Sequence, residues 1–137
     1  MPPLLEVRNL EAAYGDAQVL WGVNWRVNPG EVVAVVGPNG AGKSTTLRVI
    51  TGLLRPLRGE VWFEGERVDG KPPDVVVEQG IAMVPEGRRL FGHMTVLENL
   101  WMGGYTARAR PHRALTLQAV FDLFPILAER RHQLAGT

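Results

Sequence analysis

Residues 37–45 read Gly-Pro-Asn-Gly-Ala-Gly-Lys-Ser-Thr and match the phosphate-binding loop pattern G-x-x-x-x-G-K-[ST] at every fixed position. Just before this loop, residues 31–36 read Glu-Val-Val-Ala-Val-Val, a run typical of a strand buried on both faces. Just after it, residues 44–52 read as a short helix. Strand, loop and helix are the context that the pattern requires, so the sequence predicts an α/β fold with a nucleoside triphosphate site.

The residue types of the loop suit a polyphosphate. Its glycines permit backbone angles closed to residues with a Cβ, so consecutive N–H groups can turn toward the phosphates. The N–H groups at the start of the following helix and the positive end of its dipole also favour an anion. We therefore predict that the nucleotide contacts the whole loop, which comprises Gly37, Pro38, Asn39, Gly40, Ala41, Gly42, Lys43, Ser44 and Thr45.

Three polar residues end the loop, and each has a separate predicted role. Lys43 carries a flexible point charge that can reach the β- and γ-phosphates. The Ser44 hydroxyl is placed to ligate the Mg²⁺ ion that bridges those phosphates, and Thr45 is placed to donate to a further phosphate oxygen. The alternative is a glycine-rich turn that matches the pattern by chance, which the flanking strand and helix disfavour.

A second candidate site residue follows another predicted strand. Residues 81–84 read as a buried strand, and Glu86 lies just beyond it in a loop with Arg88 and Arg89. A carboxylate at the end of a parallel strand lies at the edge where ligands bind in open α/β sheets, so Glu86 is a functional candidate. The two arginines are read either as partner contacts or as a solvated pair.

The amino-terminal part of the chain predicts further strands. Residues 4–14 and 19–27 read as half-buried strands, and residues 60–68 read as a hairpin. The second strand alternates so that Trp21 and Trp25 share one face. We expect both tryptophans to pack in the core rather than to form a ligand platform.

The remaining segments favour helices. Residues 72–79 read as a short helix because prolines suit a first turn, although a run of valines favours a strand. A second helix begins at Thr95, where Glu98 completes the spacing of a capping box. An amphipathic helix follows from Leu115 until Pro125 interrupts it.

The composition argues against several classes of function. Fifteen basic and fourteen acidic side chains give a net charge of +1, which offers no electrostatic argument for a nucleic-acid partner. With no cysteine and three dispersed histidines, side chains alone predict neither a disulfide nor a metal site. No apolar run approaches the ~20 residues of a membrane span, so we expect a soluble chain without direct membrane insertion, and the lack of cysteine permits a cytosolic location.

The chain from Leu4 onward resembles the ATP-binding subunits of ABC transporters, and most closely those of branched-chain amino acid importers. The phosphate-binding loop alone specifies only a nucleotide-binding superfamily. The narrower likeness rests on these runs: Tyr14-Gly15, Gly37 to Thr45, Val84 to Phe91, Met94 to Val96, Glu98 to Leu100, Met102 to Gly104, Leu123 to Pro125, Glu129 to Arg131 and Ala135 to Thr137.

The resemblance implies a fold and a division of the chain. The fold is α/β, a P-loop NTPase of the ABC type, and residues 1–137 form one incomplete nucleotide-binding domain. Within it, an antiparallel β subdomain takes residues 1–30 and 58–70. The P-loop core with a partial parallel sheet takes residues 31–57 and 71–92, and the start of a helical subdomain takes residues 93–137.

The resemblance also implies roles for single residues. Tyr14 stacks on adenine, the alternative being an ordinary tyrosine at a strand end. Glu86 stands where most of the superfamily has a glutamine near the Mg²⁺ ion and the attacking water. Lys43 and Glu86 are thus the implied catalytic residues, Ser44 and Glu86 the implied metal ligands, and ATP and Mg²⁺ the implied cofactors.

The implied function is to couple ATP binding and hydrolysis to the import of branched-chain amino acids. The implied partners are a second ATP-binding subunit, identical or different, and permease subunits that hold the protein at the cytoplasmic face of the inner membrane. In the family, Ala-Gly-Thr is followed by the Leu-Ser-Gly-Gly signature, the aspartate strand with its catalytic glutamate, and the switch histidine, so the chain reads as truncated just before the signature. We therefore expect this chain by itself to bind Mg-ATP without hydrolysing it. The alternatives are a hydrolysis-incompetent nucleotide-binding or interaction module, and a non-transport ABC ATPase.

Overall fold

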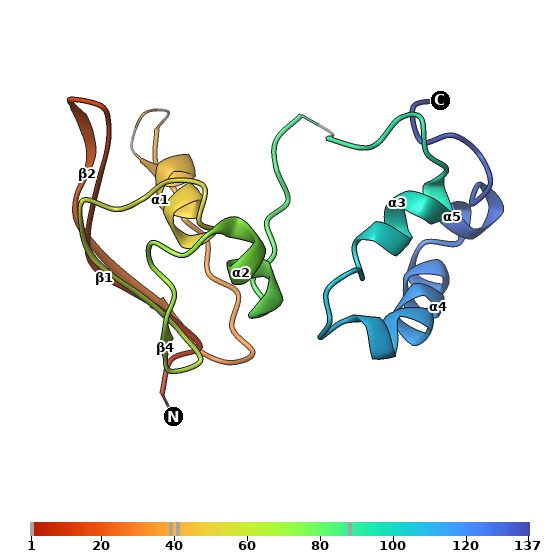
Figure 1. The fold of residues 1–137 in the computed structure, drawn as a ribbon, viewed down its shortest axis with the longest axis horizontal. Helices are drawn as coiled ribbons and strands as arrows, with labels where there is room; N and C mark the ends of the chain where they lie inside the picture. The colour runs from red at the N-terminus through yellow and green to blue at the C-terminus, as the bar shows by residue number, and fades with distance from the viewer. Residues whose placement is uncertain (1, 39, 41, 88) are drawn as a thin grey trace. The chain divides into compact units, whose positions relative to one another are not determined.

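The computed structural model describes residues 2–38, 40, 42–87 and 89–137. The chain divides into two compact units, the first ending at Met83 and the second comprising Val84–Thr137. The first unit holds a β-sheet and the helices α1 and α2, and the second holds the remaining helices (Figure 1).

Four antiparallel strands form the sheet of the first unit, in the order β2-β1-β3-β4. β1 (Leu5–Tyr14) and β2 (Ala17–Val27) form a long hairpin. β3 (Arg58–Phe63) and β4 (Glu66–Arg67) form a short one. The two half-buried strands and the hairpin that the sequence predicts at 4–14, 19–27 and 60–68 are thus present, and pairing between them provides backbone hydrogen bonds.

The register of the long hairpin shifts at Gly22, which decides where the tryptophans point. Gly22 has a left-handed φ of 85°, and the pairing of the two strands is irregular around it. Trp25 packs against the core, but Trp21, opposite Glu11, is 74% exposed while its neighbour Leu20 is buried. The expectation of a buried Trp21 is therefore wrong, because an extra residue in a strand exchanges the two faces beyond it.

The core of the first unit lies between the sheet and its helices. α1 (Lys43–Ile50) contributes its last two residues to this core and approaches β2 (Figure 1). α2 (Pro73–Glu78) has the predicted proline in its first turn and buries Val76. The fully buried core cluster comprises Val7, Leu10, Ala12, Leu20, Val49, Ile50, Val61 and Val68.

Two predicted strands do not form. Residues 31–38 and 81–85 have no regular secondary structure, so the strands expected at 31–36 and 81–84 are wrong for this structure. Val32 is 97% exposed and Val84 is 94% exposed. A central parallel strand needs a hydrogen-bonded neighbour on each edge, and no described segment pairs with either run. Among the described residues the sheet is wholly antiparallel, and the expected partial parallel sheet is not formed.

The second unit is built from short helices. α3 (Val96–Met102) has the predicted capping box, since Glu98 N donates to Thr95 Oγ1 at 3.1 Å and Thr95 N donates to Glu98 Oε1 at 3.0 Å. The 3-10 turn η1 (Arg110–His112) leads into α4 (Arg113–Leu123), which begins earlier than the sequence predicts. Pro125 ends this helix as predicted and also opens α5 (Pro125–Glu129).

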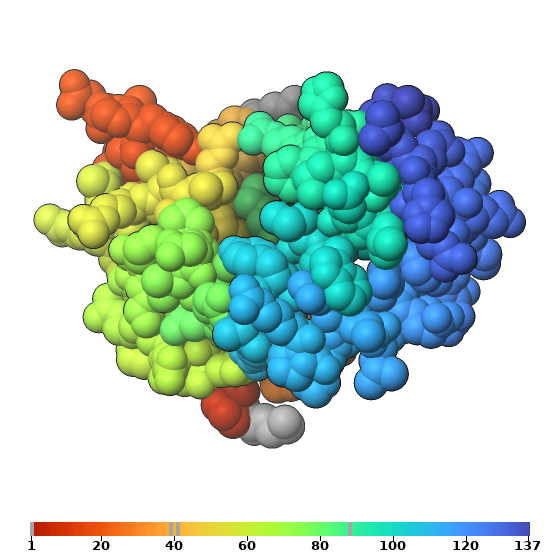
Figure 2. Space-filling view, turned by 45° about the vertical axis from the view of Figure 1, so that its right-hand side comes forward, coloured from red at the N-terminus to blue at the C-terminus, as the bar shows by residue number. Residues whose placement is uncertain are grey.

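The last residues of the second unit run back along its beginning. The Val96 amide donates to the Gln133 carbonyl at 2.9 Å, and the Ala135 amide donates to the Met94 carbonyl at 2.9 Å. Figure 2 shows the dark blue C-terminal segment beside the teal start of the same unit. Backbone bonds between residues far apart in sequence thus close this unit on itself.

Candidate nucleotide-binding site

The predicted loop leads into α1, as its pattern requires. Gly40 and Gly42 have left-handed φ values of 87° and 90°, which residues with a Cβ rarely adopt. Gly42 is the N-cap of α1, so the unpaired N–H groups of the first helical turn follow it directly. Asn39 and Ala41, also predicted to bind nucleotide, lie outside the described residues.

Lys43 spans the loop. Its ammonium group donates a hydrogen bond to the carbonyl oxygen of Gly37, the first residue of the pattern. Gly37, Pro38 and Gly40 are exposed, so this loop borders solvent. The lysine of the pattern thus lies beside the backbone amides at the start of α1. Its positive charge and the positive end of the helix dipole together favour an anion there.

Thr46 fixes the turn from loop to helix, a role that the sequence analysis missed. Both its amide and its hydroxyl donate to the Gly42 carbonyl at 2.9 Å, and the residue is 4% exposed. A Ser or Thr hydroxyl bonded to the carbonyl four residues earlier is a frequent pattern in helices. Thr46, which follows the last residue of the pattern, therefore has a structural role. In the sequence, its position four residues after Gly42 could have indicated this hydrogen bond.

Ser44 and Thr45 face different surroundings. Ser44 is exposed, as a metal or phosphate ligand would be. Thr45 is only 6% exposed, and its hydroxyl oxygen lies 3.4 Å from the hydroxyl oxygen of Tyr14. Arg48, one helical turn further along α1, donates to the same Tyr14 hydroxyl at 2.9 Å.

Tyr14 therefore lies at the end of β1 with its hydroxyl against α1, and the residue is 42% exposed. The Thr45 contact is the main cause that lowers the pKa of Tyr14 below its ordinary value, and the hydrogen bond and positive charge of Arg48 lower that pKa further. The structure brings Tyr14 together with the helix that carries Lys43, Ser44 and Thr45, although these residues are far apart in sequence.

Glu86 belongs to the second unit, where it is exposed in an irregular segment. Its neighbour Arg88 lies outside the described residues, and Arg89 is exposed. The roles of Glu86 in catalysis and metal binding stay predictions.

A Mg²⁺ ion fits the chemistry of this loop through the Ser44 hydroxyl. No group of three or more His, Asp or Glu side chains that could hold a metal occurs within the described part of the chain. Mg²⁺ in phosphoryl-transfer sites is held by few protein groups together with substrate phosphates. The exposed Ser44 hydroxyl beside Lys43 fits that mode of binding.

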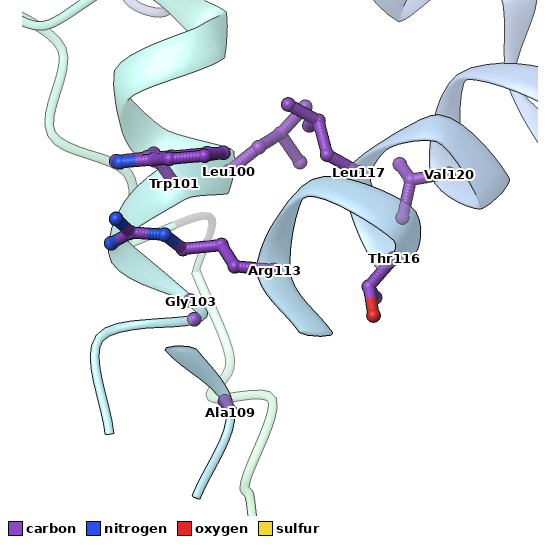
Figure 3. Close-up of a pocket in the computed structure, with 9 residues that line it drawn as sticks. Leu100, Trp101, Gly103, Ala109, Arg113, Thr116, Leu117 and Val120 are labelled. Carbon is purple, nitrogen blue, oxygen red and sulfur yellow. The ribbon is translucent and has the colours of Figure 1, made fainter. Parts of the chain in front are cut away.

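The second unit carries a separate hollow between α3 and α4, with a volume of about 260 Å³ (Figure 3). The Arg113 guanidinium lies over the Trp101 ring, 3.8 Å from its centroid. Leu100, Leu117 and Val120 form the apolar wall that Figure 3 shows beside this pair. The hollow is thus mainly apolar, with one cation stacked on an aromatic ring.

Three comparisons identify relatives of this chain. The model of the ABC transporter family matches residues 20–136. The branched-chain amino acid transport ATP-binding protein BraG of Pseudomonas aeruginosa is 40% identical over 98% of this chain and 57% of its own length. BraF of the same organism, also a branched-chain amino acid transport ATP-binding protein, is 34% identical over 96% of this chain and 49% of its own length.

A solved structure of an ATP-binding cassette is also similar to this chain. A nucleotide-free ATP-binding cassette from an ABC transporter superposes with a TM-score of 0.78 at 30% identity, covering 98% of this chain and 58% of that one. The chain spans about half the length of the relatives it matches.

Sheet, loop and helix are those of an ABC-type ATP-binding domain of the α/β P-loop class. The chain belongs to the ABC transporter family. Within the described residues, no helix is both long enough and apolar enough to span a bilayer.

Proposed function

We propose that this chain is the N-terminal part of the ATP-binding subunit of a branched-chain amino acid importer. The observation that carries the nucleotide site is the Lys43 ammonium group placed across the loop, on the Gly37 carbonyl, at the N-terminus of α1. Phosphates of ATP would replace that carbonyl as the partner of Lys43 and accept from the first amides of the helix. The names of BraG and BraF support the choice of transported substrate.

The other predicted site residues take their places in this proposal. Ser44 ligates Mg²⁺ together with the phosphates, Thr45 contacts a phosphate oxygen, and the exposed ring of Tyr14 stacks on adenine. Glu86 acts near the metal ion and the attacking water. Bound Mg²⁺ would neutralise charge on the β- and γ-phosphates as the bond between them breaks.

The proposed partners are a second ATP-binding subunit and the permease subunits of the importer. We assign residues 93–137, which make up most of the second unit, to the start of the helical subdomain, which in this family faces the permease. Its large exposed apolar side chains support this assignment, since a partner protein would remove them from water. They include Leu115 at 77%, Leu123 at 72% and Phe124 at 52% exposed. Through these partners the protein would lie at the cytoplasmic face of the inner membrane.

Calorimetry with Mg-ATP tests the nucleotide site. Lys43→Ala should nearly abolish binding, because Lys43 is the one basic side chain that this proposal places on the phosphates. Lys71→Ala is the matched control, since Lys71 is the other lysine of the chain and should bind as the unchanged chain does. Tyr14→Ala should weaken binding by about 5- to 150-fold, as the loss of ~1–3 kcal/mol of base stacking implies. Unchanged affinity in both Lys43→Ala and Tyr14→Ala would reject these roles.

Phosphate release tests the second part of the proposal, that the 137-residue chain binds ATP without hydrolysing it. Turnover of about 1 s⁻¹ or faster, within the usual range of enzymes, would contradict it.

The import function is tested by uptake of labelled leucine in cells that lack the reading frame encoding this chain. Uptake equal to that of the parent cells would argue against branched-chain amino acids as the cargo.

A further inference from the structure

We propose that Arg48 is a positioning residue for the nucleotide base, which it serves by anchoring the hydroxyl of Tyr14 so that the tyrosine ring is held in place to stack. The inference rests on the proposed function, because it assumes that Tyr14 contacts the base. It adds a residue and an interaction that the phosphate-binding pattern does not contain.

The geometry of three side chains carries the inference. Thr45 and Arg48 are three residues apart on α1 and therefore lie on one face of the helix. Both reach the hydroxyl of Tyr14, Arg48 Nη1 at 2.9 Å and Thr45 Oγ1 at 3.4 Å. The shorter contact involves a charged donor, and charge-assisted hydrogen bonds are roughly twice as strong as neutral ones.

The direction of these bonds follows from the chemistry of the groups. A guanidinium has no acceptor, so Arg48 must donate and the Tyr14 oxygen must accept. The proton of the Tyr14 hydroxyl is then free to point toward Thr45 Oγ1, the other oxygen within reach. Arg48 and Thr45 thus both contact the Tyr14 hydroxyl. Neither of these hydrogen bonds involves the aromatic ring.

Anchoring the hydroxyl has a specific effect on the ring. The hydroxyl lies on the long axis of the side chain, so fixing it sets where the ring points while rotation about that axis remains possible. Tyr14 as a whole residue is 42% exposed, so solvent reaches it in this structure. An exposed aromatic side chain that is already held loses less conformational freedom when a base stacks on it.

The test separates binding of the base from binding of the phosphates. The affinities of Mg-ATP and of inorganic triphosphate are measured by calorimetry for the 137-residue chain and its variants. Arg48→Met keeps the length of the side chain and removes the donor. It should weaken ATP binding about 2- to 10-fold more than triphosphate binding, the range expected when one side chain must be ordered on binding.

Two further variants control for charge and for fold. Tyr14→Phe keeps the ring and the arginine and should give the same selective loss, and Arg48→Met combined with Tyr14→Phe should add nothing to either single change. Arg55→Met removes an equal charge from an exposed arginine of the same unit and should leave the ratio of the two affinities unchanged.

A second measurement does not depend on nucleotide. The chain has two tyrosines, so a Tyr105→Phe background leaves Tyr14 as the only phenol to titrate by its tyrosinate absorbance. Arg48→Met in this background should raise the pKa of Tyr14, since the arginine lowers it. An unchanged pKa would overturn the contact between Arg48 and Tyr14, and a merely structural role for Arg48 would leave the ratio of affinities unmoved.

The possible results separate a failure of the positioning role of Arg48 from a failure of the proposed nucleotide binding. If the unchanged chain fails to bind ATP, the proposed function falls and this inference with it. If the unchanged chain binds ATP and Arg48→Met loses ATP and triphosphate equally, or loses neither, only the positioning role is overturned. Independent losses in Arg48→Met and Tyr14→Phe that multiply in the double variant would overturn it as well.

Discussion

Gly42 lies so close to Leu20 that a Cβ atom on the glycine would stand 2.5 Å from the leucine Cδ2 atom. The glycine also has a left-handed φ of 90°, which costs a residue with a Cβ roughly 1–2 kcal/mol. Overpacking against a buried leucine adds about 1–3 kcal/mol. We expect Gly42→Ala to lower the free energy of unfolding by the sum of both, measured by urea unfolding.

Gly30→Ala is the control for that variant. Gly30 has a left-handed φ of 74°, but nothing lies within 4 Å of a Cβ built there. It should show the conformational cost alone, about 1–2 kcal/mol. Equal losses in Gly30→Ala and Gly42→Ala would mean that the contact between α1 and β2 is not as close as described.

Leu20 and Trp21 should differ sharply in their contribution to stability. Leu20 is 2% exposed and Trp21 is 74% exposed. Leu20→Ala should destabilise the chain by about 2–5 kcal/mol, because it leaves a cavity in the core. Trp21→Ala should change the free energy of unfolding by no more than about 0.5 kcal/mol, as is usual at the surface. The reverse order, measured by urea unfolding, would show that the register shift at Gly22 is misplaced.

Asp69 should make the stability of the first unit depend on acid pH. Burial acts to raise the pKa of Asp69, but hydrogen bonds from Arg67 and the Val61 amide, with the charge of Arg67, lower it overall. A carboxyl whose pKa is lower in the folded than in the unfolded chain stabilises the fold fully above its unfolded value of about 4. That contribution is lost as the pH falls through the folded pKa.

Asp69→Asn tests this dependence. The variant should be less stable than the unchanged chain by about 1 kcal/mol at pH 7. The difference should shrink as the pH is lowered below about 4, since the carboxyl then becomes neutral in the unchanged chain as well. Urea unfolding at several pH values measures it, with exposed Asp16→Asn as the control. A difference that stays constant from pH 7 to acid pH would exclude the ionised carboxylate as its cause.

Thr95→Ala should destabilise the start of α3. The substitution removes the Thr95 hydroxyl that accepts from the Glu98 amide at 3.1 Å. Loss of such an N-cap costs about 1 kcal/mol. Thr95→Ser keeps the hydroxyl and should cost little. Hydrogen exchange of the α3 amides reports the effect locally, and equal exchange rates in both variants would show that the cap is not formed.

The antiparallel strands and short helices were predictable because their signals are local. Alternation marked β1 and β2, proline in a first turn marked α2, and the Thr95 and Glu98 spacing marked the cap of α3. Each depends on residues near one another in sequence. The valines at 31–36 carry an equally clear pattern, yet they are irregular here, because a parallel strand requires neighbours that its own residues cannot supply.

Some features of the candidate site were likewise predictable from the sequence, and others were not. The phosphate-binding pattern and its family resemblance are properties of consecutive residues, so the sequence by itself determined that Gly37 to Thr45 carry the pattern. The contacts of Tyr14 with Thr45 and Arg48 join residues more than thirty positions apart, at 3.4 and 2.9 Å. Only the tertiary structure decided them, because they exist where α1 packs on the sheet, and no local pattern records which side chains meet there. The exposure of Trp21 was decided likewise, by one left-handed glycine that exchanges the faces of a strand.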